Sequence, residues 1–346
     1  MNPHLENQNI ISHIIQESDK KCPHLSKPAL NNISSSYFLK YLFSHITEKT
    51  KLKLIKINKN IQNKINISVE NYKKYNKEKT SIEIEITLEK SNSKYINVEK
   101  VDKKYYKNKY IDYNKIEIIV DYKVKSFKKL FSLCDIQSIK FKKFYRNNII
   151  DMDSMFCGCA FLKEITFLNF NTENVKNMHC MFHGCSKLKE LDLSKFNTKN
   201  VKNMSGMFCL CSDLKKIEIS NFETLNVTNM SAMFANCAML EKIDISKFNT
   251  INVSDMNGMF AGCLALKNIN ISNFNIHNLI DISNMFFNCK SLEQIDLFNF
   301  NTNKIINIDN MFAACSDKLK TKIKKQNPNI NKKVFEVPND DILDFY

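Results

Sequence analysis

Residues Met181–Phe208 read MFHGCSKLKELDLSKFNTKNVKNMSGMF, and this segment ends on the same Met-Phe pair with which it begins. A cysteine follows three residues after each such Phe, and the step from one copy to the next is 26 residues. Seven copies follow one another without insertion, and their cysteines are Cys159, Cys185, Cys211, Cys237, Cys263, Cys289 and Cys315. A fixed period of this length predicts a stacked-repeat fold, in which each unit buries its apolar face against its neighbours.

The first half of each unit has the pattern of a short strand. In the quoted segment, Leu188, Leu191 and Leu193 follow the frame L-x-x-L-x-L, whose alternating part is typical of a strand with one buried face. A Phe-Asn-Thr triplet follows the strand. The side chain of Asn197 suits a turn at that corner, because an Asn amide hydrogen-bonds to nearby backbone groups.

The second half of each unit has the spacing of a short helix. Val201, Met204, Met207 and Phe208 recur at intervals of three and four residues, which predicts one helical or 3₁₀ turn. The residue just before Met204 suits a helix N-cap, and this position holds Asn177, Asn203, Asn229, Asp255, Asp281 and Asn307 in successive repeats. We therefore expect one strand, one corner and one helical turn in every repeat.

The segment Lys189–Met204 closely resembles the repeat of the BspA-type leucine-rich repeat family, which joins an M-F-x-x-C-x-x-L core to a following L-D-L-S-x-F-N-T-x-N-V-x-N-M segment. The resemblance extends over residues 124–320 and includes a degenerate first unit at residues 127–144. It implies an α/β repeat fold, namely a leucine-rich-repeat-like solenoid of about eight units. It also implies a non-catalytic surface for adhesion or recognition.

Composition divides the chain into two parts, because eleven of the twelve Tyr lie at or before Tyr145 while all five Gly lie between Gly158 and Gly262. We expect a flexible segment at residues 1–35, a small helical and β domain at 36–120, the solenoid at 121–320, and a C-terminal cap and tail at 321–346. Within the small α+β domain, apolar spacing predicts helices at 36–65 and strands at 81–88 and 115–122, with a loop at 99–114.

Residues Tyr37–Lys59 resemble an F-box, with a short helix, a turn and a second helix. The Leu-Pro pair that opens that motif is replaced by Ser36-Tyr37, and the motif's Trp is missing. The resemblance implies that residues 36–65 dock a Skp-type adaptor of a cullin ligase.

The positive charge is concentrated in the first part of the chain. Residues 1–150 hold 30 Lys and Arg against 15 Asp and Glu, which accounts for the whole net charge of +15. Such a surface attracts nucleic acid or an acidic membrane, although lysines spread over solvated faces give the same count. Arg146 is the only arginine, and nucleic-acid readers favour Arg for bidentate contacts. We therefore do not expect a nucleic-acid-binding protein.

The N-terminal residues indicate a cytoplasmic protein. His4, Glu6, Glu17 and Asp19 interrupt the first 21 residues, so the apolar core of a signal peptide is missing. The sequence also contains no run of 18 apolar residues to span a membrane. The alternative, suggested by the BspA-type resemblance, is a surface or secreted protein that leaves the cell without a recognisable signal.

The strand residues that point away from the core are the candidate partner-binding site. One outward column contains Asp192, Glu218, Asp244, Asn270 and Asp296, and the next contains Ser194, Ser220, Ser246 and Ser272. Stacked carboxylates repel one another, and a basic partner or a cation would relieve that repulsion. Alternatively, Asp and Ser belong to the repeat consensus and support the turn.

The cysteines are expected to pack rather than to react. The seven repeat cysteines form one internal column, where small apolar thiols pack well and a reducing cytosol disfavours disulfides. Cys157, His183 and Cys209 share a second column, and two thiolates with an imidazole are a less favoured candidate for a zinc site.

No phosphate-binding glycine loop or nucleophile elbow occurs, so we expect no enzyme and no cofactor. The sequence favours an intracellular protein-binding repeat protein that is, in its finer form, an F-box-like substrate receptor. The alternative is a BspA-type adhesion protein.

Overall fold

The computed structural model describes residues 82–89, 106–112, 115–120, 124–145, 147–295, 297 and 305–337. These residues all belong to one compact unit, Thr80–Tyr346. The segment predicted to be flexible at 1–35, the F-box-like helices at 36–65 and the acidic tail after residue 337 lie outside the described residues.

A five-stranded sheet with the order β2-β3-β1-β4-β5 opens the unit. Its strands are β1 (Ile82–Leu88), β2 (Tyr106–Asp112), β3 (Lys115–Val120), β4 (Ile136–Lys143) and β5 (Glu164–Phe167). The first four pair antiparallel, whereas β4 and β5 pair parallel. In β1 every second side chain is buried, as its alternating Ile and Glu residues predict. The strands predicted at 81–88 and 115–122 are therefore confirmed.

The loop predicted at residues 99–114 is wrong over residues 106–112, which form β2. This strand pairs antiparallel with β3, so that Tyr106 lies opposite Val120 and Tyr110 lies opposite Ile116. Tyr and Ile favour strands, and the hairpin partner supplies backbone hydrogen bonds. The Lys- and Asn-rich composition of this segment gives no indication of that pairing.

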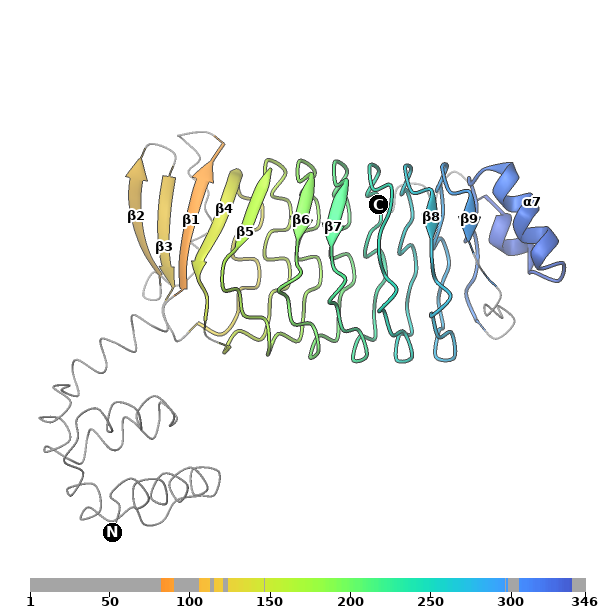
Figure 1. Ribbon diagram of the computed structural model, residues 1–346, viewed down its shortest axis with the longest axis horizontal. Coiled ribbons are helices and arrows are strands. Elements are labelled where there is room, and N and C mark those ends of the chain that lie inside the picture. Colours follow the sequence, from red (N-terminus) through yellow and green to blue (C-terminus); the bar gives the residue numbers. More distant parts are fainter. Residues whose placement is uncertain are drawn as a thin grey trace, which may run out of the picture. The chain divides into compact units, whose positions relative to one another are not determined.

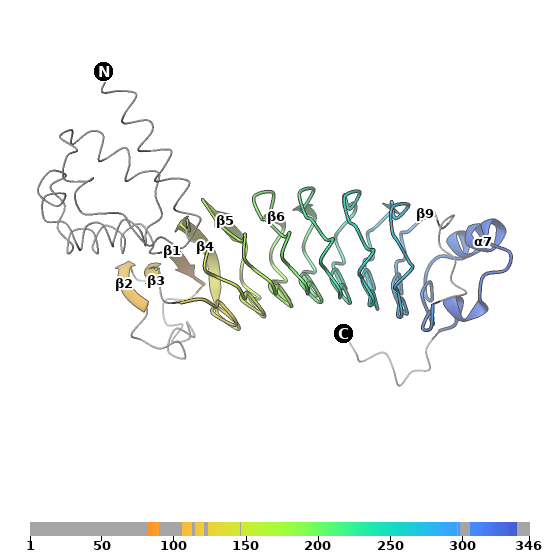
Figure 2. The ribbon, with the colours of Figure 1, turned by 90° about the horizontal axis from the view of Figure 1, so that it is seen from below.

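The 26-residue repeats stack side by side through parallel pairing. Residues one repeat apart are paired between β6 (Glu190–Asp192) and β7 (Lys216–Glu218), and between β8 (Asn268–Ile269) and β9 (Gln294–Ile295). A second line of single bridges joins residue 151 to 177 and continues at the same step to residue 307. Figures 1 and 2 show the resulting coils in a row from β4 to β9. The short strand predicted for each repeat is confirmed in these units.

The core between the strands and the opposite turns consists of columns of identical side chains. The Met-Phe pair of every repeat is fully buried, and the rings of successive repeats stack with centroids 5.2 Å apart for Phe208 and Phe234 and 5.7 Å apart for Phe182 and Phe208. Because each ring contacts the rings before and after it, a repeat inside the stack has no exposed apolar face, which is how the sequence period becomes a continuous core.

The segment predicted to be helical consists instead of successive tight turns, and the described chain between residues 124 and 295 contains no helix. Within one repeat, Met181 N–H donates to the Met178 carbonyl and His183 N–H donates to the Cys180 carbonyl. The alternate residue Phe182 donates to the Met207 carbonyl of the next repeat, at 2.8 Å. In this segment, every second backbone N–H therefore bonds to a carbonyl of the neighbouring repeat. In an α-helix all of these N–H groups would bond to carbonyls of the helix itself.

Residues with left-handed backbone make this alternation possible. Two positions per repeat, four residues apart, have φ between 50° and 73°, as at Ser154 with Gly158 and at Cys180 with Gly184. All five Gly of the chain occupy these positions, and Asn occupies several others. Gly and Asn tolerate this conformation better than other residues. Other positions of the series hold residues such as Leu133 and Leu210, so the Gly and Asn residues are a partial sequence signal for this backbone.

Polar ladders hold the corners after the strands. The buried hydroxyl of Thr198 accepts a hydrogen bond from Glu223 N–H at 2.8 Å and donates to the Glu223 carbonyl at 2.9 Å. Asn200 donates through Nδ2 to the Glu173 carbonyl of the preceding repeat, at 2.8 Å. The same bonds recur at the equivalent Thr and Asn of neighbouring repeats. Because buried polar groups are costly without partners, these ladders fix the corner backbone.

The last coil is closed by α7 (Asp317–Gln326), which begins at the side-chain cap of Ser316, and by a 3₁₀ helix at Lys332–Phe335. Leu319 and Ile323 of α7 are buried, and Val334 is buried where its carbonyl accepts a bond from Phe312 N–H at 2.7 Å. The solenoid was predicted to extend to residue 320, but α7 begins at Asp317, so the C-terminal cap starts inside the predicted solenoid segment. Within the described ranges, no helix has the length and apolar character that a membrane crossing requires.

Candidate functional site

The outward columns predicted from the sequence lie on the surface formed by the strands. We call this surface the strand face and define it by Asp192, Glu218, Asp244 and Asn270 with the serines two residues after each. Asp192, Asp244 and Asn270 are exposed and Glu218 is partly exposed. The pairing of β6 with β7 places Asp192 beside Glu218, so the predicted column exists. Asp296 lies outside the described residues.

Within the described residues, each side chain of this column also supports a turn in its own repeat. Ser194 N–H donates to Asp192 Oδ1 at 2.9 Å, and Ser246 N–H donates to Asp244 Oδ1 at 3.0 Å. Asn270 accepts the same bond from Ser272 N–H at 3.0 Å, although its side chain is neutral. The structure therefore supports the turn interpretation of these columns, and it leaves the charge of the Asp and Glu residues available for a second role.

The carboxylates are stabilised in their charged form. The side-chain and backbone hydrogen bonds of Ser194 lower the pKa of Asp192, with a smaller contribution from Lys195 and Lys216. For Glu218, the hydrogen bonds of Ser220 lower the pKa even though Asp192 and Asp244 act in the opposite direction. The repulsion expected within the column is therefore outweighed by local hydrogen bonds, and the strand face carries negative charge at neutral pH.

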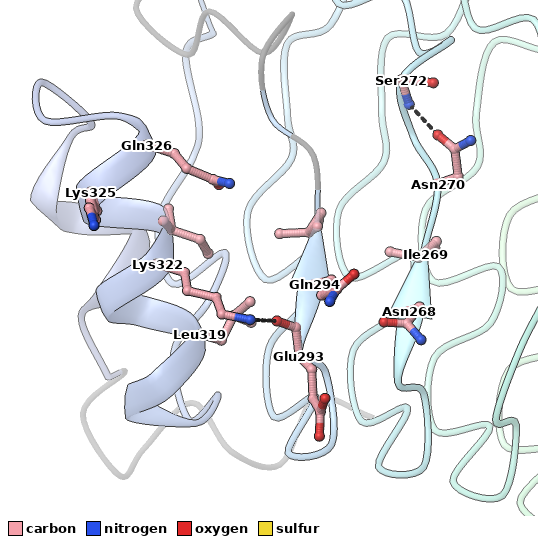
Figure 3. Close-up of a pocket in the computed structure, with 12 residues that line it drawn as sticks. Asn268, Ile269, Asn270, Ser272, Glu293, Gln294, Leu319, Lys322, Lys325 and Gln326 are labelled. Atoms are coloured by element: carbon pink, nitrogen blue, oxygen red, sulfur yellow. Dashed lines mark hydrogen bonds between the residues drawn. The ribbon is translucent and has the colours of Figure 1, made fainter.

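The strand face ends in a cavity of about 840 Å³ between β8, β9 and α7. Figure 3 shows α7 beside the two strands, with Lys322 Nζ donating to the backbone carbonyl of Glu293 at 3.2 Å. Amide and hydroxyl groups line the cavity together with lysines, namely Asn268, Asn270, Ser272, Gln294, Lys325 and Gln326. Apolar periodicity could not predict this cavity, because it forms only where Leu319 and Ile323 of α7 pack against the last coil.

The cysteine column is an internal ladder, as predicted. The thiol of Cys211 donates to the Phe182 carbonyl at 3.2 Å, and the equivalent bond is made by Cys159, Cys185, Cys237, Cys263, Cys289 and Cys315. All seven side chains are buried, and the described cysteines form no disulfide. Burial raises the pKa of Cys263 to about 12, so the ladder thiols are neutral and unreactive.

The second cysteine column does not assemble the candidate zinc site. Within the described part of the chain, no three His, Cys, Asp or Glu side chains are grouped so that they could hold a metal ion. Burial raises the pKa of Cys157, and it raises that of Cys209 to about 12. Burial also lowers the pKa of His183.

One protein family matches the repeats. Residues 125–238 and 210–326 match the family described as "Mycoplasma protein of unknown function, DUF285", and together they cover more than half of the 346-residue chain. The chain belongs to this family. The two matched segments overlap and begin in different repeats, as expected for a DUF285 region built from one repeated unit.

Among solved structures, the DUF285 chain is similar to a leucine-rich repeat protein from Bacteroides ovatus. The two sequences are 20% identical, the TM-score is 0.30, and the match covers 60% of this chain and 59% of that protein. The chain therefore spans less than two thirds of that protein's length. No curated protein matches.

Proposed function

We propose that the chain is a non-catalytic protein-binding repeat protein that recognises its partner through the strand face. The observation that carries the proposal is the column of Asp192, Glu218 and Asp244, whose carboxylates are solvent-accessible, charged and fixed by hydrogen bonds to the following serines. Fixed side chains lose little conformational entropy when a partner binds. A row of like charges across three successive repeats favours a basic partner surface.

The structure offers a way to remove this charge without removing the turn. Asn270 accepts the turn hydrogen bond at 3.0 Å as Asp244 does. The triple substitution Asp192→Asn, Glu218→Gln and Asp244→Asn should therefore keep the fold and abolish the negative column. A matched control replaces Asp213, Glu241 and Glu336 by their amides, since these acids lie outside the strand-face columns and outside the cavity in which the strand face ends.

The test is affinity capture of proteins by the full-length chain, its triple variant and the control, followed by mass spectrometry. A protein that is captured by the wild type and the control, but not by the triple variant, is the partner of the strand face. Equal capture by all three chains would refute the proposed surface.

The same experiment addresses the finer proposal that the protein is an F-box-like substrate receptor. A Skp-type adaptor bound through residues 36–65 would be captured by all three chains, because that segment is unchanged in each. Its absence removes the receptor proposal and leaves the binding surface. Capture of a surface protein alone would favour the adhesion alternative that the BspA-type resemblance suggests.

A further inference from the structure

A second, polar groove runs along the corner where the strands end. It consists of two cavities of about 630 and 440 Å³ that share Lys195 and Asn197 as lining residues. The larger cavity also includes Leu225, Lys247 and Asn249, and the smaller includes Tyr145. We call these two cavities the corner groove. Except for Ser194, its lining residues are not part of the strand face.

The threonine ladder makes the corner groove rigid. Thr172 and Thr224 line the two cavities, and each buried hydroxyl holds both backbone groups of a residue in the next repeat. The residues fixed in this way are Asn197 and Asn249. The backbone positions of the lining residues are therefore set before any ligand arrives, which reduces the entropic cost of binding.

The groove presents two pairs of hydrogen-bond donors. Lys195 and Lys247 are exposed, and within the described residues no carboxylate lies within ion-pair distance of either ammonium. Asn197 and Asn249 each accept a backbone hydrogen bond through Oδ1 at 3.1 Å, which leaves their Nδ2 groups as donors. Each Lys-Asn pair is therefore suited to bind an anionic oxygen group.

The two donor pairs are separated by a repeat of different character. In that intervening repeat, Asn221 stands in place of the lysine and Glu223 stands in place of the asparagine. Neighbouring strands are about 4.8 Å apart, so the donor pairs lie about 10 Å from each other. A ligand should therefore carry negative charges at this interval and a hydrogen-bond donor between them, opposite Glu223.

We propose that the corner groove binds an extended acidic segment of a partner protein, with Asp or Glu at every third residue. In the polyproline II conformation, three residues complete a turn and advance about 9 Å, so every third side chain points the same way at the required interval. Leu225, in the intervening repeat, is 51% exposed and offers apolar surface to a proline ring between the acids.

The probe is a fluorescent peptide with four copies of Glu-Pro-Ser, and its binding to the full-length chain is followed by fluorescence anisotropy at low salt. A peptide with four copies of Glu-Pro-Ser-Ser carries the same charge at the wrong interval. We expect the first peptide to bind at least about tenfold more tightly than the second, a difference of about 1.4 kcal/mol.

The matched variants test whether the groove lysines are responsible. Lys195→Glu with Lys247→Glu should weaken binding of the Glu-Pro-Ser peptide by at least about tenfold, because two favourable contacts become repulsive. The control is Lys215→Glu with Lys267→Glu, a pair of exposed lysines that are also two repeats apart but lie outside both cavities. The control should bind as the wild type does.

Equal binding of the two peptides, or equal loss in both double variants, would overturn the proposal. Tight binding of the linear acidic polysaccharide polygalacturonate that depends on Lys195 and Lys247, without binding of either peptide, would also overturn it and assign a glycan to the groove. Lys195 and Lys247 act electrostatically on Asp192 and Asp244, so the triple amide variant of the strand face separates the two proposals. It should still bind the Glu-Pro-Ser peptide, whatever becomes of strand-face capture.

Discussion

We predict that removing one hydroxyl of the threonine ladder lowers the free energy of unfolding substantially and weakens the structure mainly at that corner. Thr198→Val keeps the shape of the side chain, which is completely buried, but leaves the Glu223 N–H and carbonyl without the partners that lie at 2.8 and 2.9 Å. The equivalent position in a later repeat is Ile276, so an apolar side chain is sterically acceptable there.

The expected cost follows from the two backbone groups of Glu223. An unsatisfied buried donor or acceptor costs about 1–3 kcal/mol. Because the side chain of Glu223 is exposed, water can reach part of its backbone, and we expect a total loss of about 2–3 kcal/mol. The control is Thr228→Val, since this exposed hydroxyl makes a single 3.3 Å bond to the Lys202 carbonyl. It should change stability by less than about 0.5 kcal/mol.

Two measurements check this prediction. Urea unfolding followed by circular dichroism gives the change in the free energy of unfolding, and hydrogen exchange reports on the Glu223 amide itself. We expect the Thr198→Val chain to lose stability and this amide to exchange faster, whereas other repeats keep their protection. If unfolding and exchange of the Glu223 amide are both unchanged, the ladder does not stabilise the corner and the reasoning is refuted.

Two further predictions concern the turns and the thiols. Gly184→Ala should lower stability by about 1 kcal/mol because its φ is +70°, whereas Gly184→Asn should cost less, since Asn236 and Asn288 adopt the same conformation; equal melting temperatures for Ala and wild type would contradict this. Burial raises the pKa of ladder thiols, for example that of Cys263 to about 12. The free energy of unfolding should therefore fall as pH rises above about 9, by up to ~1.4 kcal/mol per pH unit for each ladder thiol. The unfolded state releases the thiol protons first, so the urea midpoint should be lower at pH 10 than at pH 8. Cys263→Ala should reduce this difference. A constant midpoint would show that the thiols are not protected.

The repeat period and the buried columns could be predicted from the sequence because both depend on identical residues at identical positions. Met207, Phe208 and Cys211 are apolar, recur without exception, and are buried as expected. The short strands followed for the same reason, since Leu191 and Leu193 alternate with exposed residues. These properties depend on local pattern alone, which one sequence contains in full.

The turn segment could not be predicted in the same way, because its apolar spacing is compatible with two backbones. The three-residue spacing of Val201, Met204 and Met207 places their side chains on one face of a helix, and it does the same in a series of tight turns. The choice depends on where the N–H groups find acceptors. In this chain the acceptor of Phe182 N–H is a carbonyl 25 residues later, and apolar periodicity contains no information on such a bond. The left-handed Gly and Asn positions are the local clue that decides between the two.

The same ladders explain where specificity is located. The Thr, Asn and Cys columns each bond to a neighbouring repeat, so these positions cannot vary without loss of a hydrogen bond. At the strand and corner positions between them the repeats differ: Lys195 and Lys247 alternate with Asn221, which donates to the Ser194 carbonyl of the preceding repeat, and Asn270 replaces Asp244. The stack is therefore a uniform frame, and the strand face and the corner groove are among the positions at which its repeats differ. A partner that recognises this chain must recognise the order of those side chains along the stack.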